Sequence, residues 1–205
     1  MNGSAAAAAA ARTPTRDRIV FAAAELFRRQ GYSGTGLKQV VAEAEAPFGS
    51  LYHHFPGGKR ELGEEVLRRA GAFFEALVTS VYDGEAGPEA SVRAVFAGAA
   101  ETLEATGYED ACPIATVALE VASTDERLRQ ATADVFEQWT GSLADRIGDR
   151  DRALAVIAAL EGAFVLCRAS RSTAAMHAAG EMAAARAADA ERGGEEAAGE
   201  ASVVE

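Results

Sequence analysis

Residues 31–62 read GYSGTGLKQVVAEAEAPFGSLYHHFPGGKREL, and they place two short helical patterns on either side of a tight turn. The segment LKQVVAEA (37–44) repeats apolar residues at helical spacing. The residues EAP break that helix, and Pro47 can open a second one. In this second helix Leu51 and Phe55 lie four residues apart, so both face inward. Two short helices joined by a tight turn predict a helix-turn-helix module.

Further helical patterns surround this pair. Thr13 and Pro14 are typical of a helix start, with threonine as N-cap and proline at the first helical position. Thr35 is expected to cap the helix that begins at Leu37. Alternating β-branched runs are not evident, so we predict an all-α fold. The expected flanking helices span about 15–30, 59–79, 89–106, 112–122, 125–147, 150–170 and 173–189, with a loop at 83–88.

The charge is distributed unevenly. The net charge of the 205 residues is −11, which by itself disfavours nucleic acid as a partner. Residues 12–70, however, carry ten basic and seven acidic groups, a balance of +3, so the rest of the chain carries −14. Any nucleic-acid binding is therefore expected in this mildly basic head.

Several classes of protein are disfavoured by what the sequence contains. Cys112 and Cys167 are far apart and lack metal-ligand spacing, so we expect two buried thiols in a reducing compartment. Apolar runs are too short for a membrane span, and we expect the first 12 residues to form a disordered leader rather than a signal peptide. Nucleophile elbows, phosphate loops and metal-protease motifs are not found, so we expect no enzyme and no cofactor. Residues 190–205 are predicted to form a disordered acidic tail.

The segment quoted above resembles the TetR family of transcriptional regulators, over about residues 13–75. A glycine-aromatic turn precedes the module, G-S-L-Y-x-H-F fills its second helix, and a lysine opens the next one. APFGSLYHHFPGGK is similar to the LmrA/YxaF-like branch. The resemblance implies a helix-turn-helix DNA-binding domain at 13–58 and a ligand-binding and dimerisation domain at 59–189. It also implies a cytoplasmic, homodimeric repressor on a palindromic double-stranded DNA operator, released by a small hydrophobic or aromatic effector.

The resemblance also implies which side chains meet DNA. Gly49 allows close approach of the backbone, and His53 is expected at a base edge or a phosphate. Adjacent helical residues point about 100° apart, so His53 and His54 are poorly placed to bind one metal ion. The expected DNA-binding residues are Thr35, Lys38, Phe48, Gly49, Ser50, Tyr52, His53, His54 and Lys59.

Two residues depart from the pattern of the branch. Glu45 stands at the turn where relatives usually have glycine, and a left-handed backbone there costs glutamate on the order of 1 kcal/mol. Phe48 stands where Arg or Lys is common, which weakens operator binding or alters the base preference. These departures and the acidic balance keep a second hypothesis open, a helical protein–protein adaptor that no longer binds DNA well.

The body of the chain has a candidate ligand pocket and a candidate dimer face. Plain core packing is the alternative for the pocket, and a monomer core is the alternative for the dimer face. Residues 152–170 are apolar around much of the helix, so with 173–190 they are expected to form half of an intersubunit four-helix bundle. The candidate pocket residues are Phe73, Phe74, Leu77, Phe96, Trp139, Phe164 and Cys167.

Overall fold

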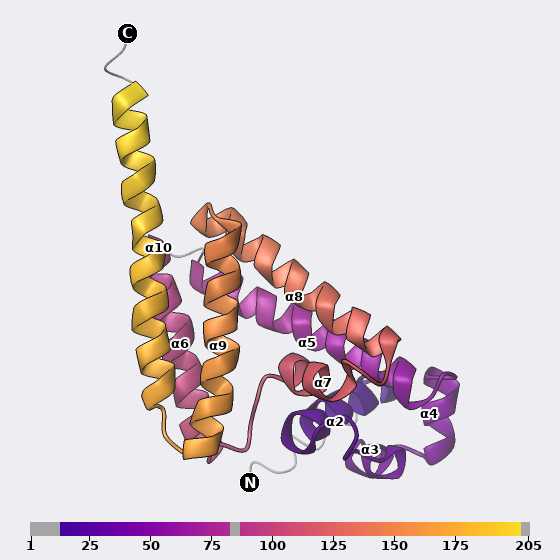
Figure 1. Cartoon of the computed structure of the whole chain (residues 1–205). Coiled ribbons are helices and arrows are strands. Elements are labelled where there is room, and N and C mark those ends of the chain that lie inside the picture. Colours follow the sequence, from indigo (N-terminus) through magenta and orange to yellow (C-terminus); the bar gives the residue numbers. More distant parts are fainter. Residues whose placement is uncertain (1–12, 83–86, 202–205) are drawn as a thin grey trace. The chain divides into compact units, whose positions relative to one another are not determined.

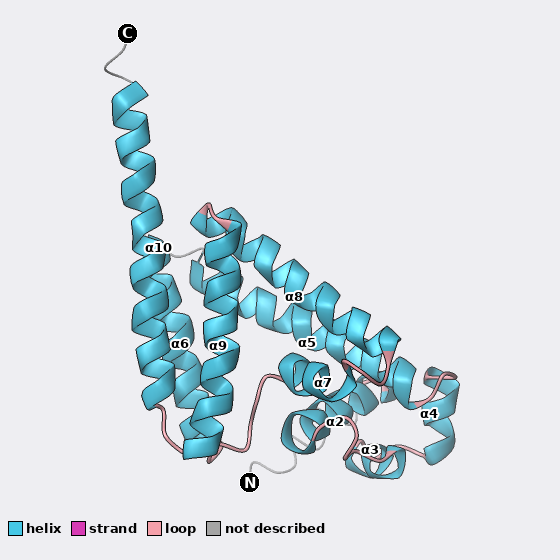
Figure 2. Cartoon of the chain, viewed as in Figure 1, coloured by secondary structure: helices cyan, strands magenta, loops and turns pink. Residues whose placement is uncertain are grey.

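The computed structural model describes residues 13–82 and 87–201, with side chains described as far as residue 187. Within these ranges the chain forms helices joined by turns and has no strand, as predicted (Figure 2). The predicted leader at 1–12 and most of the predicted loop at 83–88 lie outside the described residues. The helices are α2 (Thr15–Gln30), α3 (Leu37–Glu43), α4 (Phe48–His54), α5 (Lys59–Tyr82), α6 (Gly87–Ala105), α7 (Pro113–Val121), α8 (Glu126–Ile147), α9 (Arg150–Ser170) and α10 (Ala174–Ala201).

The helix starts differ from the expected caps. Pro14, not Thr13, is the N-cap of α2, and Gly36, not Thr35, is the N-cap of α3; neither makes a side-chain capping bond. Both cap predictions were therefore wrong by one residue. Side-chain capping does occur at α9, where Asp149 accepts a hydrogen bond from the backbone N–H of Arg152.

Helix α10 extends past the predicted end at residue 189. Its backbone is helical as far as Ala201, so the prediction of a disordered tail was wrong for residues 190–201 (Figure 1). Four alanines and four glutamates in this segment favour the helix and outweigh its three glycines. Residues 202–205 lie outside the described residues.

The chain divides into two compact units. Among the described residues, one comprises 13–71 and 113–135, and the other comprises 72–82, 87–112 and 136–201. Helices α5 and α8 contribute residues to both. The predicted boundary after residue 58 was therefore misplaced, because the first half of α5 buries Leu62, Val66 and Leu67 within the first unit.

The first unit is built on α2, α3 and α4. Its most deeply buried side chains include Ile19, Phe27, Val40 and Leu51, at 0% exposure each. Ion pairs fasten α2 to the start of α5. Arg16 and Arg69 both bind Glu65 there, and Arg69 also binds Asp17 of α2.

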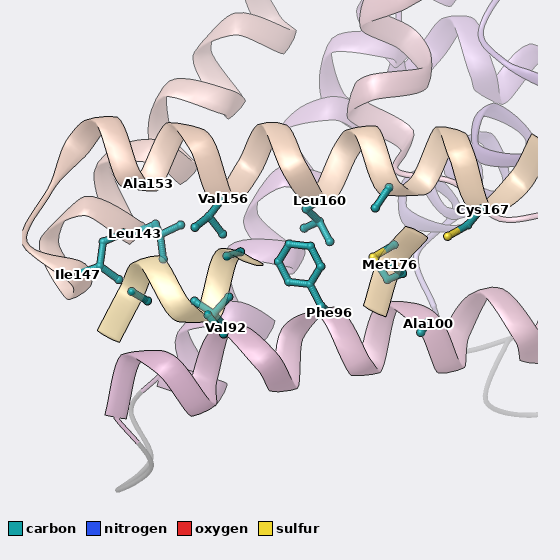
Figure 3. Packing of buried hydrophobic residues seen from close by; sticks show 14 of the residues in the cluster. Val92, Phe96, Ala100, Leu143, Ile147, Ala153, Val156, Leu160, Cys167 and Met176 are labelled. Atoms are coloured by element: carbon teal, nitrogen blue, oxygen red, sulfur yellow. The ribbon is translucent and has the colours of Figure 1, made fainter. Parts of the chain in front are cut away.

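The second unit has its core between α6, α9 and α10 (Figure 3). Figure 3 shows Phe96 of α6 directed toward Leu160 of α9, with Met176 and Cys167 farther along the same core. Gly180 allows α10 to pack closely, because a Cβ atom there would lie 2.8 Å from Cβ of Phe96.

Helix α9 is more apolar than we predicted from the sequence. By length and composition it could cross a membrane, with a mean hydropathy of 1.7 over an 18-residue window. Its inward face instead packs against α6 and α10 through Ala153, Val156, Leu160, Ala163 and Cys167. The outward face of the same helix is also apolar, which accounts for the high hydropathy.

Candidate DNA-binding head and ligand cavity

The turn between α3 and α4 is held by one arginine. Arg18 of α2 donates from Nε to the carbonyl oxygen of Ala44 at 3.0 Å, and from a terminal nitrogen to that of Glu45 at 3.4 Å. Glu45 itself has φ 47°, the left-handed conformation expected at this position. The conformation of the turn is thus fixed from the supporting helix.

The inward and outward faces of α4 are clearly separated. Leu51 is 0% exposed and Phe55, just after the helix, is 1% exposed. With about 100° between successive residues, Gly49 and His53 lie opposite that core contact. Both are exposed, and a Cβ atom at Gly49 would meet nothing within 4 Å. This outward face is free to approach a second molecule.

The two flanks of α4 differ in chemistry. Phe48 and Tyr52 form one flank, are 44% and 50% exposed, and lie edge to face with ring centroids 5.7 Å apart. Ser50 and His54 form the other flank and are partly exposed. The Ser50 hydroxyl donates to the carbonyl oxygen of Pro47 at 2.6 Å. One flank is therefore aromatic and the other hydrogen-bonding.

Two of the predicted DNA contacts are engaged within the protein. Thr35 is 1% exposed and its hydroxyl donates to the carbonyl oxygen of Gly31 at 2.7 Å, so the prediction of a phosphate contact from this side chain was wrong. Lys59 places Nζ 4.4 Å from the ring centroid of Tyr32 and 3.5 Å from the carbonyl oxygen of Ser33. Burial lowers the pKa of Lys59, against an opposing effect of Glu120. Lys38 is exposed on α3.

A carboxylate of α7 holds the turn that precedes α3, a contact the sequence analysis missed. Glu120 accepts hydrogen bonds from the backbone N–H of Tyr32 at 2.9 Å and of Ser33 at 2.6 Å. Gly31 makes room for it, because a Cβ atom there would lie 2.0 Å from Glu120 Oε1. Glu120 lies almost ninety residues from Tyr32 and Ser33 in the chain, so the contact could not be predicted from local sequence pattern.

The second unit contains a pocket of about 490 Å³, a volume that includes space open to the solvent. Of the predicted pocket residues, Phe74, Phe96 and Trp139 line it. Phe73 and Leu77 do not: they are 74% and 51% exposed. The full lining comprises Phe74, Glu75, Val78, Tyr82, Val92, Val95, Phe96, Trp139, Ser142, Leu143, Arg146, Val156, Ile157 and Leu160.

The predictions that Phe164 and Cys167 line the pocket were also wrong. Phe164 and Cys167 pack into the core of α6, α9 and α10 rather than line the pocket. Phe74, by contrast, lies with its ring centroid 4.5 Å from that of Trp139. Phe74, Val78 and Tyr82 line the pocket at i, i+4 spacing, and this spacing was the signal available in the sequence.

The walls of the pocket are mostly apolar, with a few polar groups. Arg146 donates to Ser142 and to the hydroxyl of Thr79. Burial raises the pKa of Tyr82, and Arg146 opposes that shift. The space inside the pocket has room for only a few water molecules.

Comparison with known proteins identifies the family. Residues 19–66 match the family described as bacterial regulatory proteins, tetR family, and residues 88–182 match the C-terminal domain of transcriptional regulators of the LmrA/YxaF-like type. The chain belongs to the TetR family. The resemblance found at residues 31–62 is thus confirmed, including its branch.

TetR-family relatives match over most of the chain. YxaF of Bacillus subtilis, an uncharacterised HTH-type transcriptional regulator, is 35% identical over 136 residues, 66% of this chain and 71% of the relative. LmrA of the same organism, an HTH-type transcriptional regulator, is 28% identical over 172 residues, 80% and 92% of the two chains. The reduced form of NemR from Escherichia coli has the same fold, with a TM-score of 0.76, 22% identity, and 82% and 94% coverage.

TetR-family membership also settles the broad class of activity. These proteins are transcriptional regulators with a DNA-binding helix-turn-helix domain, not enzymes. In the part of the chain whose side chains are described, no group of three or more His, Cys, Asp or Glu residues is placed to hold a metal ion. His53 and His54 lie edge to face, with ring centroids 4.9 Å apart.

Proposed function

We propose that this protein is a cytoplasmic, ligand-responsive repressor that binds a palindromic operator as a homodimer. The observation that carries the proposal is the outward face of α4. Arg18 and the buried Leu51 hold this helix in place, yet Gly49, Tyr52 and His53 are exposed. In helix-turn-helix proteins such a helix lies in the major groove.

A homodimer would cover the outward face of α9 and α10. Leu154, Val165 and Leu166 of α9 are 55%, 55% and 60% exposed, and Met182 of α10 is 55% exposed. Neighbouring alanines and Gly162 allow close approach of another helix. Burying this face against a second copy would complete a four-helix bundle, and a two-fold dimer would match a palindromic operator.

The effector would bind in the pocket of the second unit. Phe74, Phe96 and Trp139 favour a small hydrophobic or aromatic molecule, since aromatic rings pack well against one another. A ligand that binds more tightly to one arrangement of the dimer shifts the population toward it. Release from the operator follows if that arrangement no longer fits two half-sites.

A gel-shift series on DNA selected by the full chain from a random duplex pool tests operator binding. We expect a palindrome to be enriched and its affinity to fall steeply as salt rises, because phosphate contacts release counterions. Tyr52→Phe should weaken binding to all duplexes alike if its hydroxyl donates to a phosphate. Binding of no duplex, even at low salt, would refute the proposal and favour the adaptor.

The dimer and the effector site have separate tests. Leu166→Arg should yield a monomer in sedimentation, whereas Leu119→Arg, at a leucine of α7 that is 77% exposed, should leave the dimer intact. Trp139 is the one tryptophan of the chain, so an aromatic effector should change its fluorescence. Phe96→Ala should weaken that response, and the bound effector should lower operator affinity.

A further inference from the structure

An exposed aromatic pair marks one flank of α4. Phe48 is 44% exposed, although a phenylalanine side chain is stabilised by leaving water. Its ring lies edge to face with that of Tyr52, at 5.7 Å between centroids, so the orientation of the ring is supported by a neighbour. Phe48 thus presents an exposed apolar surface beside the outward residues Gly49 and His53.

The position of Phe48 along the helix favours contact with bases. It lies in the first turn of α4, and in helix-turn-helix proteins the residues of the first turn of the recognition helix contact base edges. Leu51 and Phe55 point into the core and cannot do so. Phe48 therefore combines an apolar side chain with a place close to the floor of the major groove.

The major groove offers one apolar feature among the base edges. All four bases present hydrogen-bond donors or acceptors there, and thymine presents a C5-methyl group in addition. A phenyl ring cannot satisfy donors or acceptors, and a phosphate oxygen gains nothing from it. We propose that Phe48 is a specificity-determining residue that packs on the C5-methyl group of a thymine in each operator half-site.

This inference rests on the proposed binding of α4 to DNA, and it gives the departure at Phe48 a function. Replacing a cation by phenylalanine removes a charge-assisted contact, but it adds a contact that depends on base identity. The operator half-site should therefore contain a thymine at one fixed position.

Deoxyuridine provides the direct test, because it differs from thymidine by the absence of that methyl group. The full chain first selects an operator from a random duplex pool. Each thymine is then replaced by deoxyuridine at the two symmetric positions, and affinity is measured by fluorescence anisotropy at constant salt. At one position we expect a loss of about fourfold per half-site, the factor associated with one buried methyl group.

Variants identify the residue responsible. Phe48→Ala should bind the thymine and deoxyuridine operators equally, and Phe48→Leu should retain part of the difference. Phe21→Ala is the matched control, since Phe21 is an exposed phenylalanine of α2 (65%), and it should keep the full sensitivity. Circular dichroism confirms that each variant folds.

The outcomes separate this inference from the proposed function. If the wild type binds its operator and every thymine can be replaced without loss, the methyl contact does not exist. Equal sensitivity of Phe48→Ala and the wild type would assign the methyl contact to another residue. If no duplex is bound at all, the proposed function fails, and this inference with it.

Discussion

Replacing Gly31 by alanine should destabilise the DNA-binding unit severely. Gly31 has φ 80° and ψ 170°, a region open essentially to glycine alone, and forcing another residue into it costs about 1–3 kcal/mol. The new Cβ atom would lie 2.0 Å from Glu120 Oε1, so the carboxylate would have to leave. Hydrogen bonds that involve a charged group are worth about 1.5–3 kcal/mol each, and Glu120 accepts two. Because Glu120 is partly exposed, we expect a total loss of about 3–5 kcal/mol.

Urea unfolding at one fixed protein concentration measures this loss, and a double-mutant cycle divides it. In a Glu120→Ala background the carboxylate is already absent, so Gly31→Ala should cost only the backbone part, about 1–3 kcal/mol. The difference between the two backgrounds isolates the displacement of Glu120. An equal cost in both, or a cost below about 1 kcal/mol in the wild type, would refute the proposed packing of α7 against this turn.

Three further predictions concern single side chains. Glu45→Gly should stabilise the protein in urea unfolding by about 0.5–1 kcal/mol, because it removes a left-handed glutamate; a loss of stability would contradict this. Burial raises the pKa of Glu161 to about 7, against a hydrogen bond from Cys112, so the wild type should lose stability as pH rises from about 4.5 through 7. Glu161→Gln should remove that pH dependence, which is worth up to about 3 kcal/mol at pH 8, and a parallel pair of stability–pH curves would contradict it. Phe48→Arg should steepen the dependence of DNA affinity on salt by about one phosphate contact and abolish the preference for thymine over deoxyuridine; an unchanged preference would exclude the methyl contact.

The helices and the helix-turn-helix module could be predicted because their determinants are local. Apolar residues at helical spacing, with glycine and proline at the ends, placed most helix boundaries within a few residues. The left-handed conformation of Glu45 was also foreseeable, because relatives usually have glycine at this position. The caps were less predictable, because Thr13 and Thr35 lie one residue outside the true N-cap positions.

The pocket and the internal contacts of the head depended on tertiary structure. Both Phe73 and Phe74 suit an amphipathic α5, and only packing decides that Phe74 turns toward Trp139 while Phe73 is exposed. Lys59 begins α5 as predicted, but its position over the ring of Tyr32 follows from how the helices pack. The spacing of apolar residues identifies the apolar face of a helix, but it does not identify which residues pack against that face.

Glu45 and Phe48, the two residues that depart from the pattern of the branch, affect different properties of the protein. Glu45 affects the stability of the turn and adds a negative charge near the DNA-binding face, and Arg18 compensates by holding the carbonyl groups of the turn. Phe48 leaves the fold of the head almost untouched, because its side chain is exposed and Leu51 and Phe55 supply the core contact. A lost phosphate contact alone would predict a weaker regulator with unchanged base preference. A ring placed on the outer flank, supported by Tyr52, predicts instead a regulator whose operator differs from those of relatives with a basic residue at this position.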